Sequence, residues 1–104
     1  MAIAFVQEFS IQDGDTSTTN YDGVVAELGL QGNDVDGLIA HTAGFDHDRS
    51  VFRIFDVWES REAGQRFIDE RLMPIVERLA SEAGEGNFDP PNVEYWYELH
   101  HVVS

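Results

Sequence analysis

The stretch VFRIFDVWESREAGQRFIDERLMPIVERL, residues 51–79, contains a change of hydrophobic period that decides the class of fold. Residues 51–59 are rich in β-branched and aromatic side chains, with large apolar residues at both parities, which is typical of a strand. Ser60 is a favourable N-cap residue. After it, apolar residues recur at helical spacing, at Ala63, Phe67, Ile68 and Leu72. The stretch therefore predicts a strand that leads directly into an amphipathic helix.

Pro74 lies inside this helical pattern. A proline has no backbone N–H, and its ring clashes with the carbonyl of the preceding turn. We therefore expect the helix to bend or break near Met73 and to continue through residues 75–83.

The rest of the chain predicts one more helix and three more strands. Residues 2–9 alternate as a strand, and a helix capped at residues 18–20 runs to about Leu28. Residues 38–45 form a second strand, joined by a hairpin to the strand at 51–59, and residues 93–103 form the last one. The order is strand-helix-strand-strand-helix-strand. This α+β order predicts a ferredoxin-like fold with a four-stranded antiparallel sheet, as a single domain of residues 1–104.

The predicted sheet has more apolar surface than its own helices can cover. Two helices of this length cover one face of four strands, yet bulky apolar side chains occur at both parities of the later strands. An exposed sheet face that carries Phe, Trp or Tyr would be a large apolar patch. We therefore expect a homodimer that forms through this sheet face.

The charge of the chain excludes some classes of partner. Its formal net charge is −14, from 20 acidic residues against six arginines and no lysine. Such a surface repels phosphate backbones and anionic lipid headgroups, so neither nucleic acid nor a membrane surface is an expected partner. The sequence has no cysteine, which excludes disulfides and thiolate chemistry. With no apolar run long enough to span a bilayer, we expect a cytoplasmic protein.

Two polar residues interrupt the second and third predicted strands. His41 and Asp56 lie nearly opposite each other if the hairpin is centred near His47 or Asp48, whereas a shift of one residue would place them on different faces. If they share a face, the carboxylate can orient the imidazole and raise its basicity, which suits a general base acting on a phenol or enol. The alternative is a structural pair that only satisfies a buried acid, and both interpretations stay open.

Aromatic residues and histidines supply further candidates for a ligand site. Trp58 lies two residues after Asp56, on the same face of the strand, where its ring could stack on an aromatic ligand. Tyr97 is expected either to pack in the sheet or to line a cavity for a planar ligand. His100 and His101 are adjacent on the predicted strand, so they diverge and cannot share a metal ion; we expect His100 at the cavity and His101 at the subunit interface. No spacing brings three or four ligands together, so we predict no metal site.

Three segments carry a resemblance to a known family. They are GLIAHTAGF at residues 37–45, the stretch at 51–79 and VEYWYELHHVV at 93–103. The most specific feature is a strand that ends in Trp58, followed by Glu-Ser and by a charged start to the helix. Over most of its length the chain resembles the dimeric α+β barrel superfamily, and within it the antibiotic-biosynthesis-monooxygenase-like proteins.

The resemblance implies a ferredoxin-like monomer whose sheet packs on that of a second copy to form a barrel, with a ligand cavity between sheet and helices. Several such proteins oxidise aromatic polyketides or quinol-like substrates with molecular oxygen and without metal or flavin, so no cofactor is expected. Trp58 corresponds to a tryptophan that lines the cavity. The haem-degrading relatives use a histidine from the long helix, and residues 60–83 contain none, so haem binding by that mode is not expected.

We therefore predict a small-molecule-binding protein, and specifically a cofactor-independent, monooxygenase-like enzyme that acts on an aromatic or polyketide-type substrate. His41 and Asp56 would be its catalytic residues, and Trp58, Tyr97 and His100 would contact the substrate. A non-catalytic ligand-binding protein, or a purely structural dimer, is the alternative. The sequence does not identify the substrate.

Overall fold

A computed structural model describes residues 2–11, 14, 17–28, 35–83 and 90–103. Its elements are β1 (Ile3–Ser10), α1 (Thr19–Leu28), β2 (Leu38–Asp46), β3 (Val51–Trp58), α2 (Arg61–Phe67), a π-helical turn η1 (Ile68–Leu72), α3 (Met73–Ala83) and β4 (Val93–Glu98). The four strands form one antiparallel sheet in the order β2-β3-β1-β4. This arrangement confirms the predicted α+β, ferredoxin-like fold.

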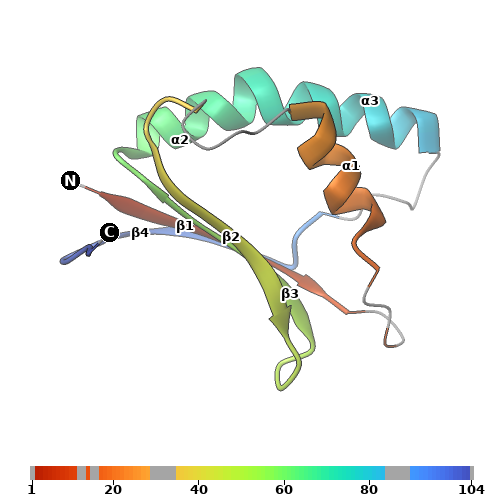
Figure 1. The fold of residues 1–104 in the computed structure, drawn as a ribbon, viewed down its shortest axis with the longest axis horizontal. Helices are drawn as coiled ribbons and strands as arrows, with labels where there is room; N and C mark the ends of the chain where they lie inside the picture. Colours follow the sequence, from red (N-terminus) through yellow and green to blue (C-terminus); the bar gives the residue numbers. More distant parts are fainter. Residues whose placement is uncertain (1, 12–13, 15–16, 29–34, 84–89, 104) are drawn as a thin grey trace.

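The helices α1, α2 and α3, with η1 between the last two, lie on one side of the sheet, as Figure 1 shows, and we call that side the covered face. The opposite side, the open face, has no helix over it in the described part of the chain. Within those same residues, no helix is long and apolar enough to cross a membrane.

The long second helix begins where the sequence predicts. The Ser60 side chain accepts a hydrogen bond from the backbone N–H of Ala63 at 3.1 Å, so it caps α2. The irregularity expected near Met73 is the π turn η1, at the end of which the Met73 N–H bonds the carbonyl of Ile68. This widened turn immediately precedes Pro74, which cannot donate a hydrogen bond. As a result α2, η1 and α3 run on as one rod (Figure 1), without a break.

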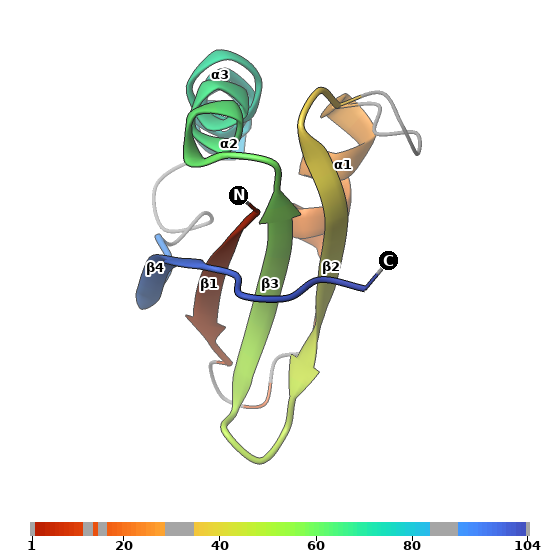
Figure 2. The same ribbon diagram turned by 90° about the vertical axis from the view of Figure 1, so that its left-hand side faces the viewer.

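The last strand is shorter than predicted. It ends at Glu98, which pairs with Ile3, the first residue of β1. One further backbone bond joins the Leu99 N–H to the Ala2 carbonyl at 3.0 Å. Since β1 extends no further, the following residues are not part of the sheet, and the chain turns across the end of the strands (Figure 2). The prediction of a strand over residues 93–103 is therefore wrong beyond residue 98.

A small aromatic core lies between the sheet and α2. Phe5, Val35 and Trp58 are buried there, and Trp58 is the largest fully buried side chain among the described residues. Phe5 stacks on Trp96 with 4.2 Å between ring centroids, and Trp58 lies 5.4 Å from the ring of Phe67. Burying such rings contributes the main hydrophobic stabilisation of the domain.

Gly64 lets α2 approach this core closely. A Cβ atom at this position would lie 2.8 Å from Cη2 of Trp96 and 3.1 Å from Cδ1 of Trp58. Both distances are shorter than ordinary carbon–carbon contacts. The absence of a side chain at Gly64 therefore fixes how near the helix packs to the two tryptophan rings.

The open face combines buried aliphatic residues with exposed aromatic ones. Val6 and Val57 are buried near the middle of the sheet although no described helix covers them, whereas Tyr95 and Tyr97 on β4 are 45% and 44% exposed. Arg53 joins two acids on this face: its Nε lies 2.8 Å from Glu8, and its Nη2 lies 3.2 Å from Asp46. We call Glu8, Arg53 and Asp46 the arginine cluster.

Candidate functional site

His41 and Asp56 meet on the covered face. The pairing of β2 with β3 places the two residues directly opposite each other on one face, and so decides between the two registers that the sequence left open. His41 Nδ1 lies 2.5 Å from Asp56 Oδ1. The Asp56 side chain is 12% exposed and the His41 side chain 29% exposed. The carboxylate is thus held inside the sheet, while the imidazole stays partly accessible.

A third residue completes the arrangement from α1. The hydroxyl of Tyr21 lies 2.6 Å from His41 Nε2, so the two imidazole nitrogens each have a partner. The Tyr21 ring lies parallel to that of His41, 6.2 Å between centroids, and meets the edge of Phe52 at 5.3 Å. We call Tyr21, His41 and Asp56 the covered-face triad.

The sequence alone assigned Tyr21 only to the apolar side of its helix. It lies in the first turn of α1, where its spacing with later apolar residues predicts packing and carries no chemical signal. Its neighbour in space, His41, is 20 residues away along the chain. Only the docking of α1 on the sheet brings the phenol to the imidazole.

The partners of His41 define its tautomer. A carboxylate can only accept hydrogen bonds, so His41 Nδ1 carries the proton that is donated to Asp56. In the neutral imidazole Nε2 is then the acceptor, and the Tyr21 hydroxyl donates to it. This is the tautomer that a histidine base requires, because its basic nitrogen points away from the carboxylate.

The surroundings shift two pKa values in the triad. The hydrogen bond to Asp56 raises the pKa of His41 above its ordinary value of 6.5, which outweighs the opposite effect of burial. Burial raises the pKa of Tyr21, with a further contribution from the negative charges of Asp56 and Asp22. At neutral pH, Tyr21 therefore stays a neutral phenol, whereas His41 is a readier proton acceptor than a free imidazole.

Trp58 lies on the same face as the triad but is packed in the core. The side chain is 1% exposed, and Phe67 lies against its ring. Its indole N–H is buried without an acceptor among the residues that the structure describes. Burying an N–H donor without a hydrogen-bond acceptor costs free energy. The predicted stacking surface is therefore covered, and the indole N–H is buried with it.

The structure does not bring the remaining predicted residues to this place. Tyr97 pairs with Ala4 on β1. Ala4 is next to Phe5, whose ring lies in the core on the covered face, so Ala4 and Tyr97 point to the open face, opposite the triad. His100 and His101 are exposed and lie beyond the end of β4. The argument that they diverge because they are neighbours on a strand therefore does not apply. A single site around His41 does not include any of the three.

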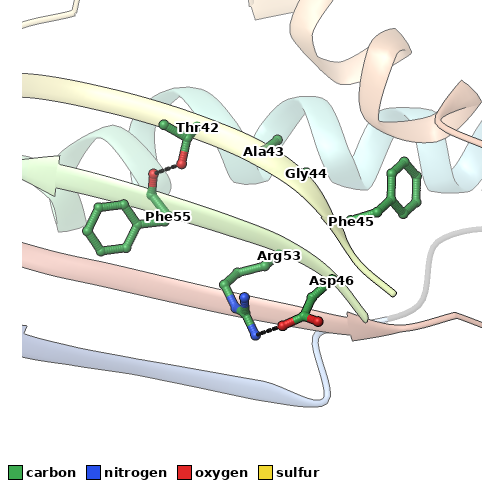
Figure 3. Close-up of a pocket in the computed structure, with 7 residues that line it drawn as sticks. All are labelled: Thr42, Ala43, Gly44, Phe45, Asp46, Arg53 and Phe55. Carbon is green, nitrogen blue, oxygen red and sulfur yellow. Dashed lines mark hydrogen bonds and ion pairs between the residues drawn. The ribbon is translucent and has the colours of Figure 1, made fainter. Parts of the chain in front are cut away.

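One hollow of the surface lies along β2 and β3, as Figure 3 shows. It has a volume of about 300 Å³ and is open to solvent; its lining residues are Thr42, Ala43, Gly44, Phe45, Asp46, Arg53 and Phe55. Arg53 is already bonded to Asp46, and the Thr42 hydroxyl donates to the Phe55 carbonyl at 2.9 Å. The polar groups of this hollow are thus paired with one another. Among the described residues, no three metal-ligating side chains converge.

Comparison with solved structures places this fold in a class: it is the fold of the antibiotic biosynthesis monooxygenase-like proteins. The chain is similar to Rv0793 from Mycobacterium tuberculosis, with a TM-score of 0.68 and 15% identity over 100% of both chains. It is also similar to SnoaB, a cofactor-independent oxygenase from Streptomyces nogalater, with a TM-score of 0.63 and 14% identity over 98% of this chain and 96% of that one.

A third similar structure is a putative antibiotic biosynthesis monooxygenase from Chloroflexus aurantiacus, with a TM-score of 0.61 and 14% identity over 100% of this chain and 98% of that one. No protein-family model matches the sequence, and no curated protein matches it. The family resemblance of the sequence is therefore confirmed at the level of the fold, while residue roles depend on this chain's own geometry.

Proposed function

We propose that this protein binds a small aromatic or polyketide-type molecule and acts on it as a cofactor-independent, monooxygenase-like enzyme. The observation that carries the proposal is the bond between His41 Nδ1 and Asp56 Oδ1, 2.5 Å long, on the covered face. It holds His41 in the tautomer of a general base and raises its pKa. The fold shared with SnoaB, a cofactor-independent oxygenase, is consistent with this class of reaction.

In the proposed reaction, His41 is the final acceptor of a proton from a phenol or enol, and Asp56 stabilises the imidazolium that results. The electron-rich anion then reacts with molecular oxygen. For a phenol with a free para position, the O–H and para C–H bonds break and a quinone forms. One oxygen atom enters the ring as the new carbonyl and the other leaves as water, so atoms and electrons balance. Trp58 would contact the substrate only after the Phe67 side chain moves off its ring, which would let the unpaired indole N–H donate to a ligand oxygen.

We further propose that residues 1–104 form a single domain that works as a cytoplasmic homodimer through the open face. Support comes from the exposed Tyr95 and Tyr97, which would form an apolar patch on an isolated monomer. Val93, which is 41% exposed and pairs with Glu8 on the same face, would continue that surface into an interface. His100 and Tyr97 would then belong to the subunit contact or to a ligand that reaches it.

Oxygen consumption with 1-naphthol, a phenol with a free para position, tests the enzyme assignment. We expect turnover to fall about 100-fold or more in His41→Gln and in Asp56→Asn, because each removes the base or its orienting partner. His47→Gln, an exposed histidine in the hairpin beyond β2, is the matched control and should retain full turnover. If His41→Gln leaves turnover of every accepted substrate unchanged, the assignment is wrong.

A second function is favoured by a different observation. Trp58 is fully buried against Phe67, and Gly64 holds α2 close to the same ring, so the predicted stacking position is filled by the protein itself. This packing suits a protein that dimerises or binds a ligand without catalysis. It predicts no oxygen consumption with any phenol, and a titration of 1-naphthol followed by tryptophan fluorescence would then separate ligand binding from a purely structural role.

A further inference from the structure

The triad leaves no free nitrogen on His41 for a substrate. Nδ1 bonds Asp56 at 2.5 Å and Nε2 bonds the Tyr21 hydroxyl at 2.6 Å. A substrate that approached Nε2 directly would first have to displace Tyr21. Displacement would leave the partly buried Tyr21 hydroxyl without a hydrogen-bond partner, which costs free energy.

The Tyr21 hydroxyl, in contrast, can still accept a hydrogen bond. A phenol donates one hydrogen bond and can accept another, and only its donor is used by His41. A substrate hydroxyl can therefore donate to Tyr21 Oη without breaking any bond within the triad.

From this geometry we propose that Tyr21 is the catalytic residue that contacts the substrate hydroxyl, and that His41 receives the substrate's proton only through Tyr21. The inference rests on the proposed function, because it assumes that a substrate proton is removed at this site. It assigns direct contact with the substrate to a residue on α1 rather than to either strand residue.

The transfer is a concerted double shift that balances. The substrate O–H bond breaks as a new O–H bond forms on Tyr21 Oη, and the original Tyr21 O–H bond breaks as an N–H bond forms on His41 Nε2. The substrate becomes an anion, His41 becomes an imidazolium beside Asp56, and Tyr21 is neutral before and after. No phenolate of Tyr21 is needed, which agrees with the raised pKa of this residue.

The ring contacts hold Tyr21 in the position that such a transfer needs. Phe52 meets the Tyr21 ring edge-on at 5.3 Å, and the His41 ring lies parallel to it at an angle of 4°. Proton transfer depends on heavy-atom distances in the hydrogen-bond range, and the 2.6 Å separation of Tyr21 Oη and His41 Nε2 satisfies that condition.

The proposal also narrows the class of substrate. A hydroxyl that accepts a hydrogen bond selects molecules that donate one, which are phenols and enols with an acidic O–H. A carbon acid whose proton lies on carbon offers Tyr21 no such donor, because C–H groups are weak donors. We therefore infer that the site ionises O–H acids and does not remove protons from carbon directly.

The test uses 4-nitrophenol, whose phenolate absorbs at a longer wavelength than the neutral form. Spectra of the bound probe are recorded below its solution pKa for the wild type, Tyr21→Phe, His41→Gln and the control Tyr95→Phe, which removes a phenol hydroxyl from the open face. We expect the wild type and Tyr95→Phe to bind the phenolate. In Tyr21→Phe the phenolate fraction should fall at least about tenfold, as in His41→Gln, with binding retained.

Two results of this experiment would be unfavourable, and they have different consequences. Phenolate formation in Tyr21→Phe equal to the wild type, with loss in His41→Gln, would overturn the relay but leave the proposed function intact. If the wild type ionises no phenol, the proposed function fails, and the catalytic role of Tyr21 with it.

A measurement without ligand tests the hydrogen bond itself. The ¹⁵N signals of the His41 ring should show Nδ1 protonated, and the Nε2 signal should move in Tyr21→Phe toward that of a nitrogen without a donor. An Nε2 signal that is the same in Tyr21→Phe and in the wild type would overturn the inference whatever the phenol experiments show.

Discussion

The two faces of the sheet each hold a buried acid with a basic partner, and the partners differ in kind. On the covered face Asp56 is paired with His41, and on the open face Glu8 is paired with Arg53. Both acids are buried, with side chains at most 12% exposed, so each needs a partner to offset its desolvation. The two basic partners differ in protonation: an imidazole gains or loses a proton near neutral pH, whereas a guanidinium stays protonated there.

This difference separates a chemical site from a structural one. Hydrogen bonding to Glu8 raises the pKa of Arg53 further above its already high ordinary value, so Arg53 keeps its charge at any physiological pH. In the triad, His41 can hold or release a proton while Asp56 keeps it oriented. The basic partner on the open face therefore has a fixed charge, whereas the basic partner on the covered face can change its protonation state near neutral pH.

The largest expected effect is on the core of the covered face. Trp58→Ala should lower the free energy of unfolding by about 3–5 kcal/mol, because it removes a fully buried ring and leaves a cavity. Urea denaturation measures this loss. Tyr97→Ala, on the open face and 44% exposed, is the comparison, and a loss from Trp58→Ala no larger than that from Tyr97→Ala would contradict the assignment of the core.

A second effect concerns the close approach of α2. Gly64→Val should destabilise the protein by about 1–3 kcal/mol through overpacking, because the added atoms would run into the rings of Trp58 and Trp96. Gly23→Ala in α1 is the matched control: its Cβ would meet nothing within 4 Å, and the change should stabilise the helix by up to about 1 kcal/mol. Thermal unfolding measures both variants, and a Gly64→Val protein as stable as the wild type would contradict the close packing of α2 on the two rings.

A smaller effect distinguishes the two acid-base pairs by pH. The pKa of His41 is raised above 6.5 in the folded state, so folding favours its protonated form. The stabilisation is fully present below about pH 6.5 and is lost as the pH rises through the folded-state pKa. The difference in unfolding free energy between the wild type and His41→Gln should shrink over that range. For Arg53→Gln the same difference should stay constant, since the guanidinium does not titrate there.

The smallest effect on the chain itself is expected at the open face. The double substitution of Tyr95 and Tyr97 by serine should change the unfolding free energy of an isolated monomer by only about 0.5 kcal/mol, because both rings are well exposed. It should nevertheless shift the proposed dimer toward monomer in sedimentation velocity. A wild type that is monomeric at all concentrations would contradict the proposed role of this face.

Local pattern was sufficient for most of the fold. The change from strand to helix at Ser60 and the hairpin between β2 and β3 follow from period and turn composition. The register that places His41 opposite Asp56 was one of two alternatives from the sequence, and the structure decides it. Features that depend on distant partners were not accessible in this way. The last strand ends at Glu98 because β1 begins at Ile3, and a hydrophobic pattern on β4 alone contains no information about where its neighbour begins.

The sequence by itself determined the order of the elements and the alternation of faces along each strand, because these depend on backbone periods and short connections. Only the tertiary structure decided that Tyr21 bonds His41, that Trp58 is packed against Phe67, and that Tyr97 points away from both. Those contacts depend on how far and at what angle α1 and α2 dock on the sheet. The docking of these helices depends on the packing of many residues together, including the missing side chain at Gly64. No single local sequence pattern specifies that docking.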